Sequence, residues 1–259
     1  MHLPAILLNL KGLMWVVLLL LPLIGLQRLL HREIQTLFFF ITHKPDKAII
    51  LFAIVFLPGV FIHELSHLLV ARLFGVNTGR FSLIPRPLPG DHLQLGYVET
   101  AQTDWVRASL VGAAPLITGG AIVGYLANYQ LHLPLLWNFL QNGQVTLFWM
   151  GLMSLPSVPN FLLWFYLTFV ISSTMLPSNS DRRAWLPLGL VLILLFGSAI
   201  LFGAGPWILK NLVPGMNSFF IAVAMLFGLS TLVHLILVIP FSGINRILAK
   251  LSNFKIRRK

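Results

Sequence analysis

Long apolar runs dominate the chain and predict membrane-spanning helices. A helix that crosses the hydrocarbon core of a bilayer needs about 20 apolar residues. Six segments meet this requirement, at about 12–30, 48–74, 105–127, 158–176, 184–206 and 217–240. The polar stretches between them are too short to form a separate soluble domain. The pattern therefore predicts an all-α polytopic membrane protein with about six transmembrane helices.

One apolar stretch, residues 145–176, does not fit a single crossing. As a continuous helix it would be about 48 Å long, at about 1.5 Å per residue, which is too long for one span and too short for two. Pro156 and Pro159 interrupt its helical pattern, because proline lacks the N–H of the helix ladder. We therefore expect 145–155 to lie at the membrane interface and 158–176 to cross.

Two alternating stretches in the loop after the second span predict strands. Residues 80–84 and 93–98 flank the segment 85–91, which is rich in proline and glycine and is typical of a turn. We expect a short β-hairpin over 79–100. An ordinary surface hairpin that only connects two helices is the alternative to a functional element.

Composition supports the membrane assignment and narrows the chemistry. Of the 259 residues, 57% are hydrophobic and 10% are charged, against about 45–50% and about 25% in soluble domains. A soluble enzyme, a disordered chain and a coiled coil are therefore excluded. The net charge of +11 is typical of cytoplasmic loops, so no nucleic-acid partner is expected. Because the chain has no cysteine, any metal must be held by histidines and carboxylates.

Basic residues predict the orientation. The last segment has no acid after Ser242 and carries Arg246, Lys250, Lys255, Arg257, Arg258 and Lys259. The positive-inside rule places this C-terminal tail in the cytoplasm. We expect an integral multi-pass protein of a bacterial cytoplasmic membrane. Counting back through six spans puts the N-terminus, the 75–104 loop with the hairpin and the turn at 181–183 on that side. Segment 28–47 carries four basic residues on the other side, and it either lies flat at the interface or is extracytoplasmic.

The sequence His63-Glu64-Leu65-Ser66-His67 lies inside the apolar segment 48–74. Ionisable side chains within a bilayer are costly and usually mark function, which argues against a chance occurrence. Residues four apart share one face of a helix, so His63 and His67 can present two imidazoles to one metal ion. Glu64, next to the first histidine, can act as general base toward a water at the metal.

A catalytic zinc site takes a third protein ligand, and Asp181 is the candidate with the expected depth and side. It follows the span 158–176, and Pro177 breaks the helix before it. Irregular backbone at membrane depth is tolerated where it is buried or lines a water-filled cavity. The alternative is a turn aspartate paired with Arg182 or Arg183. Rival ligands in the preceding loop are Asp91, His92, Glu99 and Asp104.

Three elements carry a resemblance to a known family. The first is His63-Glu64-Leu65-Ser66-His67 with Ala71-Arg72 and Gly75-Val76; the others are Ala114-Pro115-Leu116-Ile117-Thr118, and Thr174-Met175-Leu176-Pro177 with Asp181-Arg182. In this order they resemble the H-E-x-G-H-x-x-x-A-R-x-x-G-V, Gly-Pro-x-x-Asn and N-x-x-P-x-x-x-x-D-G motifs of the site-2 protease family of intramembrane zinc metalloproteases. Ala and Thr replace Gly and Asn in the second element. The third lacks the Asn, is one residue shorter between Pro and Asp, and ends in Arg, which makes the chain a divergent member.

The resemblance implies a domain organisation and an activity. Residues 48–183 would form a metalloprotease core of three transmembrane helices with the hairpin 79–100 inserted. Residues 1–47 would add a transmembrane helix and an interfacial segment, and 184–259 two further transmembrane helices and the basic tail. The implied activity is cleavage of transmembrane segments of other proteins within the lipid bilayer, under control of a regulatory membrane partner of unknown identity.

The resemblance also implies site residues. One zinc per chain would be held by His63, His67 and Asp181, with Glu64 as the catalytic base. An extended substrate would pair with a strand edge near Leu95 and Tyr97 and pass Pro115 and Thr118. Two other classes stay open: a zinc-dependent membrane enzyme acting on a lipid or small peptide, and a non-catalytic multi-span scaffold or transporter.

Overall fold

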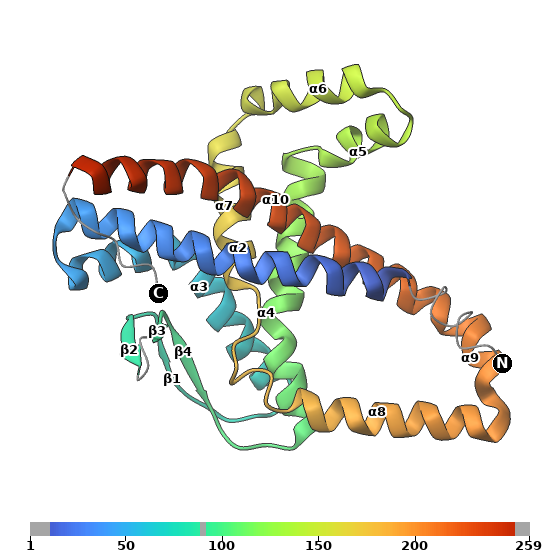
Figure 1. Ribbon diagram of the computed structural model, residues 1–259. Helices are drawn as coiled ribbons and strands as arrows, with labels where there is room; N and C mark the ends of the chain where they lie inside the picture. The colour runs from blue at the N-terminus through green and yellow to red at the C-terminus, as the bar shows by residue number, and fades with distance from the viewer. Residues whose placement is uncertain (1–10, 89–91, 252–259) are drawn as a thin grey trace. The chain divides into compact units, whose positions relative to one another are not determined.

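The computed structural model of the chain describes residues 11–88 and 92–251 (Figure 1). The candidate ligand Asp91 and four basic residues of the tail, Lys255, Arg257, Arg258 and Lys259, lie outside these ranges. The chain divides into two compact units. The first comprises Met1–Ile54, Asp104–Ser109 and Arg182–Lys259, and the second comprises Val55–Thr103 and Leu110–Asp181.

Within the described ranges, five helices are long and apolar enough to cross a membrane. They are α2 (Lys11–Thr42), α3 (Pro45–Leu73), α4 (Trp105–Tyr125) with the π-helical turn η1 (Leu126–Gln130), α8 (Trp185–Ala199) continued by η3 (Ile200–Ala204) and α9 (Gly205–Asn211), and α10 (Val213–Leu251). The protein is thus an all-α polytopic membrane protein with a small β element.

The stretch 145–176 is broken, as its prolines predict. Helix α6 (Val145–Ser154) continues into the 3₁₀ turn η2 (Leu155–Ser157), and α7 (Phe161–Thr174) follows at an angle of 98°. Counted as one span, this bent pair raises the number of candidate spans in the described ranges from five to six. Helix α5 (Leu133–Gln141) precedes it.

In the first unit, α2 and α10 pack along each other (Figure 1). The Gly12 N–H donates to Asn217 Oδ1 at 2.8 Å, and the Asn245 side-chain amide donates to Glu33 O at 2.8 Å and Oε2 at 2.7 Å. Helix α2 continues to Thr42, beyond the predicted span 12–30 and into the segment 28–47. No glycine or proline occurs in 26–42, so the helix is not interrupted where the sequence becomes more polar.

In the second unit, α7 packs closely against α3. Gly59 makes this possible, because a Cβ there would overlap the carbonyl of Val170. The rings of Phe56 and Phe169 meet edge to face at 5.4 Å, and the Tyr166 hydroxyl donates to Val55 O at 2.7 Å. This packing sets the end of α7 beside the C-terminal half of α3, where the motif histidines lie.

Helix α3 ends in a left-handed turn at Gly75, whose φ is 69°. The Val76 N–H donates to Ala71 O at 2.8 Å and the Gly75 N–H to Arg72 O at 3.1 Å. This is the Schellman arrangement, which favours glycine at that position. Val76 and Ala71 are buried together with Val111 of α4. The residues Ala71-Arg72 and Gly75-Val76 of the first motif therefore terminate the helix and fasten its end to α4.

The β element contains two antiparallel ladders. Strand β1 (Thr78–Ser82) pairs with β4 (Tyr97–Thr100), and β2 (Arg86–Leu88) pairs with β3 (His92–Gln94). The expected hairpin over 79–100 is present, but the predicted boundaries of its strands and its turn are wrong. Strand β2 lies inside the predicted turn 85–91, and Leu95 and Gly96 divide the predicted strand 93–98. A two-stranded ladder consists of edge strands, where proline is tolerated, so the prolines of the segment 85–91 do not prevent pairing.

Candidate metal centre

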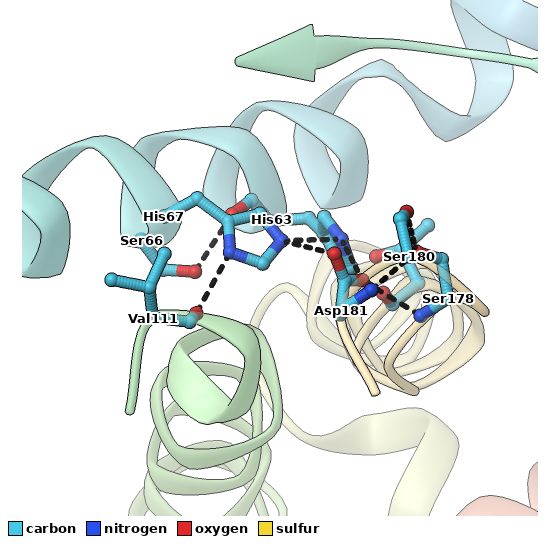
Figure 2. A network of polar contacts seen from close by, with 8 residues as sticks. His63, Ser66, His67, Val111, Ser178, Ser180 and Asp181 are labelled. Atoms are coloured by element: carbon cyan, nitrogen blue, oxygen red, sulfur yellow. Dashed lines mark hydrogen bonds and ion pairs between the residues drawn. The ribbon is translucent and has the colours of Figure 1, made fainter. Parts of the chain in front are cut away.

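Two histidines and one aspartate converge in the second unit (Figure 2). His63 and His67 lie one turn apart on α3, with their Nε2 atoms 3.2 Å apart. Asp181 follows α7 and places Oδ1 3.5 Å from His67 Nε2 and Oδ2 3.8 Å from His63 Nε2. One ligand atom from each residue lies within 4.8 Å of the others. This is the one group of three or more potential ligands among the described residues, and it could hold a metal ion.

Hydrogen bonds from the other ring nitrogens fix the histidine tautomers. His63 Nδ1–H donates to Thr174 O at 2.5 Å, and His67 Nδ1–H donates to Val111 O at 2.9 Å (Figure 2). A carbonyl only accepts, so each Nδ1 carries the proton and each neutral ring has a lone pair at Nε2. Two lone pairs and a carboxylate therefore point at one small volume. A metal cation satisfies such a set, and metal-binding histidines usually donate their other ring N–H to a carbonyl or carboxylate in this way.

The loop after α7 holds Asp181 as an acceptor. Ser178 N–H donates to Asp181 Oδ2 at 2.7 Å, Asp181 N–H donates to Ser178 Oγ at 3.4 Å, and the hydroxyls of Ser178 and Ser180 are 2.7 Å apart. Burial raises the pKa of the Asp181 carboxyl, but the pKa lies below its ordinary value, and the hydrogen bonds from Ser178 contribute to this by favouring the charged form. Asp181 is thus a carboxylate at neutral pH and faces the histidines.

Gly112 on α4 lets the Asp181 backbone approach. A Cβ at Gly112 would overlap the Asp181 carbonyl group, so any other residue there would displace the loop. The preceding residue, Val111, accepts the hydrogen bond of His67. Adjacent positions of α4 therefore fix one histidine and the aspartate. Sequence reasoning missed Val111 and the carbonyl of Thr174, because a backbone acceptor leaves no mark on side-chain identity.

Glu64 lies next to the metal group without belonging to it. Its side chain is buried, with 8% exposed, and the backbone of Gly96 lies against it. A Cβ at Gly96 would be 2.9 Å from Glu64 Cγ and 2.9 Å from Val60 Cγ1. The link between β3 and β4 thus covers the glutamate, and its close approach requires glycine. Sequence reasoning did not single out Gly96 either.

The other predicted site residues lie on two elements. Leu95 is in the link next to Gly96, and Tyr97 begins β4 with the Arg86 guanidinium 3.6 Å from its ring centroid. Pro115 is buried inside α4, and Thr118 is half-buried about one turn further on. The substrate-binding role of these four residues stays a prediction.

The described rival ligands have other positions. Glu99 Oε2 accepts the backbone N–H of Arg80 at 3.1 Å. Asp104 caps α4, where its Oδ1 accepts the N–H groups of Val106 and Arg107 at 3.0 Å each, as expected of an N-cap aspartate. His92 belongs to β3. Of the acids and histidines described, Asp181 is the one that the structure brings to His63 and His67.

A comparison with protein-family models finds no match, and comparisons with curated proteins and with solved structures find none either. The resemblance to site-2 proteases is therefore neither supported nor contradicted by these comparisons and stays a prediction.

Proposed function

We propose that this protein is an intramembrane zinc metalloprotease of the site-2 type, which hydrolyses peptide bonds in or near transmembrane segments of substrate proteins. One observation carries the proposal. The Nε2 atoms of His63 and His67 and the carboxylate of Asp181 converge on one small volume beside α3. This helix is long and apolar enough to span a membrane, and Glu64 is buried beside the three ligands.

The donor set fits zinc. Two imidazole nitrogens and one carboxylate are ligands that zinc takes in catalytic sites, where three protein ligands leave a further position open. Calcium and magnesium prefer sites made of oxygen atoms. One zinc per chain, held by His63, His67 and Asp181, is the occupancy that these three ligands support.

The metal ion, Glu64 and two backbone carbonyls would each have a separate role in the hydrolysis. A bound zinc ion would supply Lewis acidity toward the substrate carbonyl and the attacking water. The Glu64 carboxylate would accept a proton from that water and deliver it to the leaving nitrogen. The carbonyls of Thr174 and Val111 hold the histidine rings in place, so the ligands do not have to reorganise during the reaction.

The β element gives the proposal a substrate-binding surface. A peptide bond in a helix is shielded by its own hydrogen bonds, so a transmembrane substrate has to be extended before water can attack. Main-chain pairing with a strand edge would extend it with little demand on side chains. Leu95 and Tyr97 flank the Gly96 link that covers Glu64, and we propose that they bind the extended segment, together with Pro115 and Thr118.

The proposed orientation puts the C-terminus and Asp181 in the cytoplasm of a bacterial cell, and it can be tested on this cysteine-free chain. We expect Asn142→Cys, in the exposed turn between α5 and α6, to react with an impermeant thiol reagent added to intact cells. Ser180→Cys, also exposed, should react only after permeabilisation. Labelling of both cysteines from the same side would contradict a single crossing by the α6–α7 segment.

The function itself is tested with purified protein in lipid vesicles. We expect cleavage of a co-reconstituted single-span membrane protein, loss of cleavage after zinc is removed with a chelator, and recovery when zinc alone is restored, because the ligand set has no other source of Lewis acidity. Phospholipids and short soluble peptides are offered in parallel. Turnover of those substrates alone would identify a different membrane hydrolase, and zinc binding without any turnover would favour a non-catalytic scaffold or transporter.

A further inference from the structure

The two acceptors that orient the histidines are both helix carbonyls. Val111 lies inside α4, and Thr174 is the last residue of α7. In a continuous α-helix, the carbonyl of residue i accepts the N–H of residue i+4. A carbonyl that accepts this helix bond still has a second lone pair. The helix bond then determines where the carbonyl points and makes it a weaker acceptor for a second donor. Each helix therefore needs a local feature that removes the i+4 hydrogen bond and leaves the carbonyl available to a histidine.

In α4, the residue four positions after Val111 is Pro115, which stands inside the helix. Proline has no N–H and cannot donate to that carbonyl. Val111 is buried, and so are Ala114 and Pro115, so a carbonyl without a donor would be a costly unsatisfied group. The Nδ1–H of His67 satisfies it at 2.9 Å. Pro115 of α4 thus leaves open the carbonyl that accepts the hydrogen bond of His67 of α3.

In α7, Pro177 has an equivalent effect three residues after Thr174. The helix ends at Thr174, because proline disfavours helical geometry in the residue before it. Were the helix to continue, the Ser178 N–H would return to Thr174 O. Instead the Ser178 N–H donates to Asp181 Oδ2 at 2.7 Å, and Thr174 O accepts His63 Nδ1–H. One break therefore provides an acceptor for the histidine and a donor for the aspartate.

We infer that Pro115 and Pro177 are positioning residues of the metal centre: each keeps one helix carbonyl free for the Nδ1–H of one metal-binding histidine. By doing so they hold the protons of His67 and His63 on Nδ1 and direct both Nε2 lone pairs at the metal. A ring in the other tautomer carries its proton on Nε2 and cannot bind the metal through that atom. This inference rests on the metal site of the proposed function, and it is independent of whether the substrate is a protein.

The test compares proline-to-alanine variants of the full-length protein in detergent, without substrate. Zinc affinity is measured by competition with a chelator of known affinity. We expect Pro115→Ala to weaken zinc binding about 10-fold, the lower end of the range for loss of an outer-shell partner. Pro177→Ala should weaken it further, since Asp181 also loses a donor. Pro240→Ala, the same change inside α10 of the other unit, should bind zinc like the wild type.

Histidine tautomers are a readout that general loosening of a helix would not change selectively. Imidazole ¹⁵N spectra of the metal-free protein distinguish Nδ1–H from Nε2–H rings, and His63→Gln and His67→Gln assign the signals. We expect Pro115→Ala to shift His67 toward a mixture of tautomers and leave His63 unchanged, and Pro177→Ala to do the reverse. Unchanged spectra and affinity in both variants, or equal changes at both histidines, would overturn the inference.

A second substitution at position 115 distinguishes the effect of the missing N–H from the effect of the rigid proline ring. Lactic acid at position 115 has the side chain of alanine but an ester oxygen in place of the N–H. We expect it to bind zinc and to hold His67 as the wild type does. If Pro115→Ala does not fold, the ester variant tests the inference by itself. Weakened zinc binding in the folded ester variant would overturn the inference. Absence of zinc binding by the wild-type chain would instead refute the proposed function.

Discussion

Glu64→Gln is expected to lower hydrolysis of a transmembrane substrate by about 100- to 10,000-fold, the usual contribution of general base catalysis, while one zinc per chain remains bound. Glutamine has nearly the same shape but cannot accept the proton of the attacking water at neutral pH. It should also fit under the Gly96 backbone that covers Glu64. The measurement pairs initial cleavage rates in vesicles with the zinc content of the same preparation.

The matched control is Glu99→Gln, the same chemical change at an exposed residue of β4, which should keep both zinc and activity. Loss of zinc from a folded Glu64→Gln protein would make Glu64 a ligand and contradict the division of roles between the glutamate and the histidines. Full activity of the variant would remove Glu64 from the mechanism.

Asp181→Ala is expected to abolish both stable zinc binding and hydrolysis. The loss in affinity should exceed the upper limit of about 100-fold that is typical of outer-shell partners, because a ligand atom itself is removed. The change also leaves the Nε2 lone pairs of His63 and His67, 3.2 Å apart, without the carboxylate that faces them. Zinc content after gel filtration, together with chelator competition, measures the effect.

Asp104→Ala is the control for this second prediction. Asp104 was a rival ligand on sequence grounds, but in the structure it caps α4. Its loss should lower the stability of the protein modestly, because an N-cap acceptor is removed, with zinc content unchanged. Retention of zinc by Asp181→Ala, or its loss from a folded Asp104→Ala protein, would show that the third ligand is assigned wrongly.

Local sequence patterns predicted the parts of this protein that depend on neighbouring residues. Apolar runs gave the helical, multi-pass architecture, since span length follows directly from bilayer thickness. The spacing of His63 and His67 put both imidazoles on one face of α3, because helix geometry alone determines it. The positions of Pro156 and Pro159 indicated the break before α7, where the structure has a 98° bend.

Patterns were less informative where several local outcomes are close in energy. The two strands predicted at 80–84 and 93–98 correspond to four short strands, because pairing partners across the ladder decide which residues of a proline-rich loop become extended. The first helix continues beyond the predicted span 12–30 for a similar reason. Polar residues do not stop a helix that lacks glycine and proline, and α10 provides buried partners such as Asn245 for Glu33.

By itself the sequence determined that the protein is a multi-pass membrane protein and that two histidines and a glutamate share one turn of a spanning helix. It also offered Asp181 as a third ligand, but among rivals. Only the tertiary structure brings that carboxylate, 114 positions after His67 in the chain, to the histidines. It also uses the carbonyls of Val111 and Thr174 to set the tautomers. The physical reason is that backbone acceptors and close approaches at Gly96 and Gly112 depend on how helices and strands pack together, which no local pattern specifies.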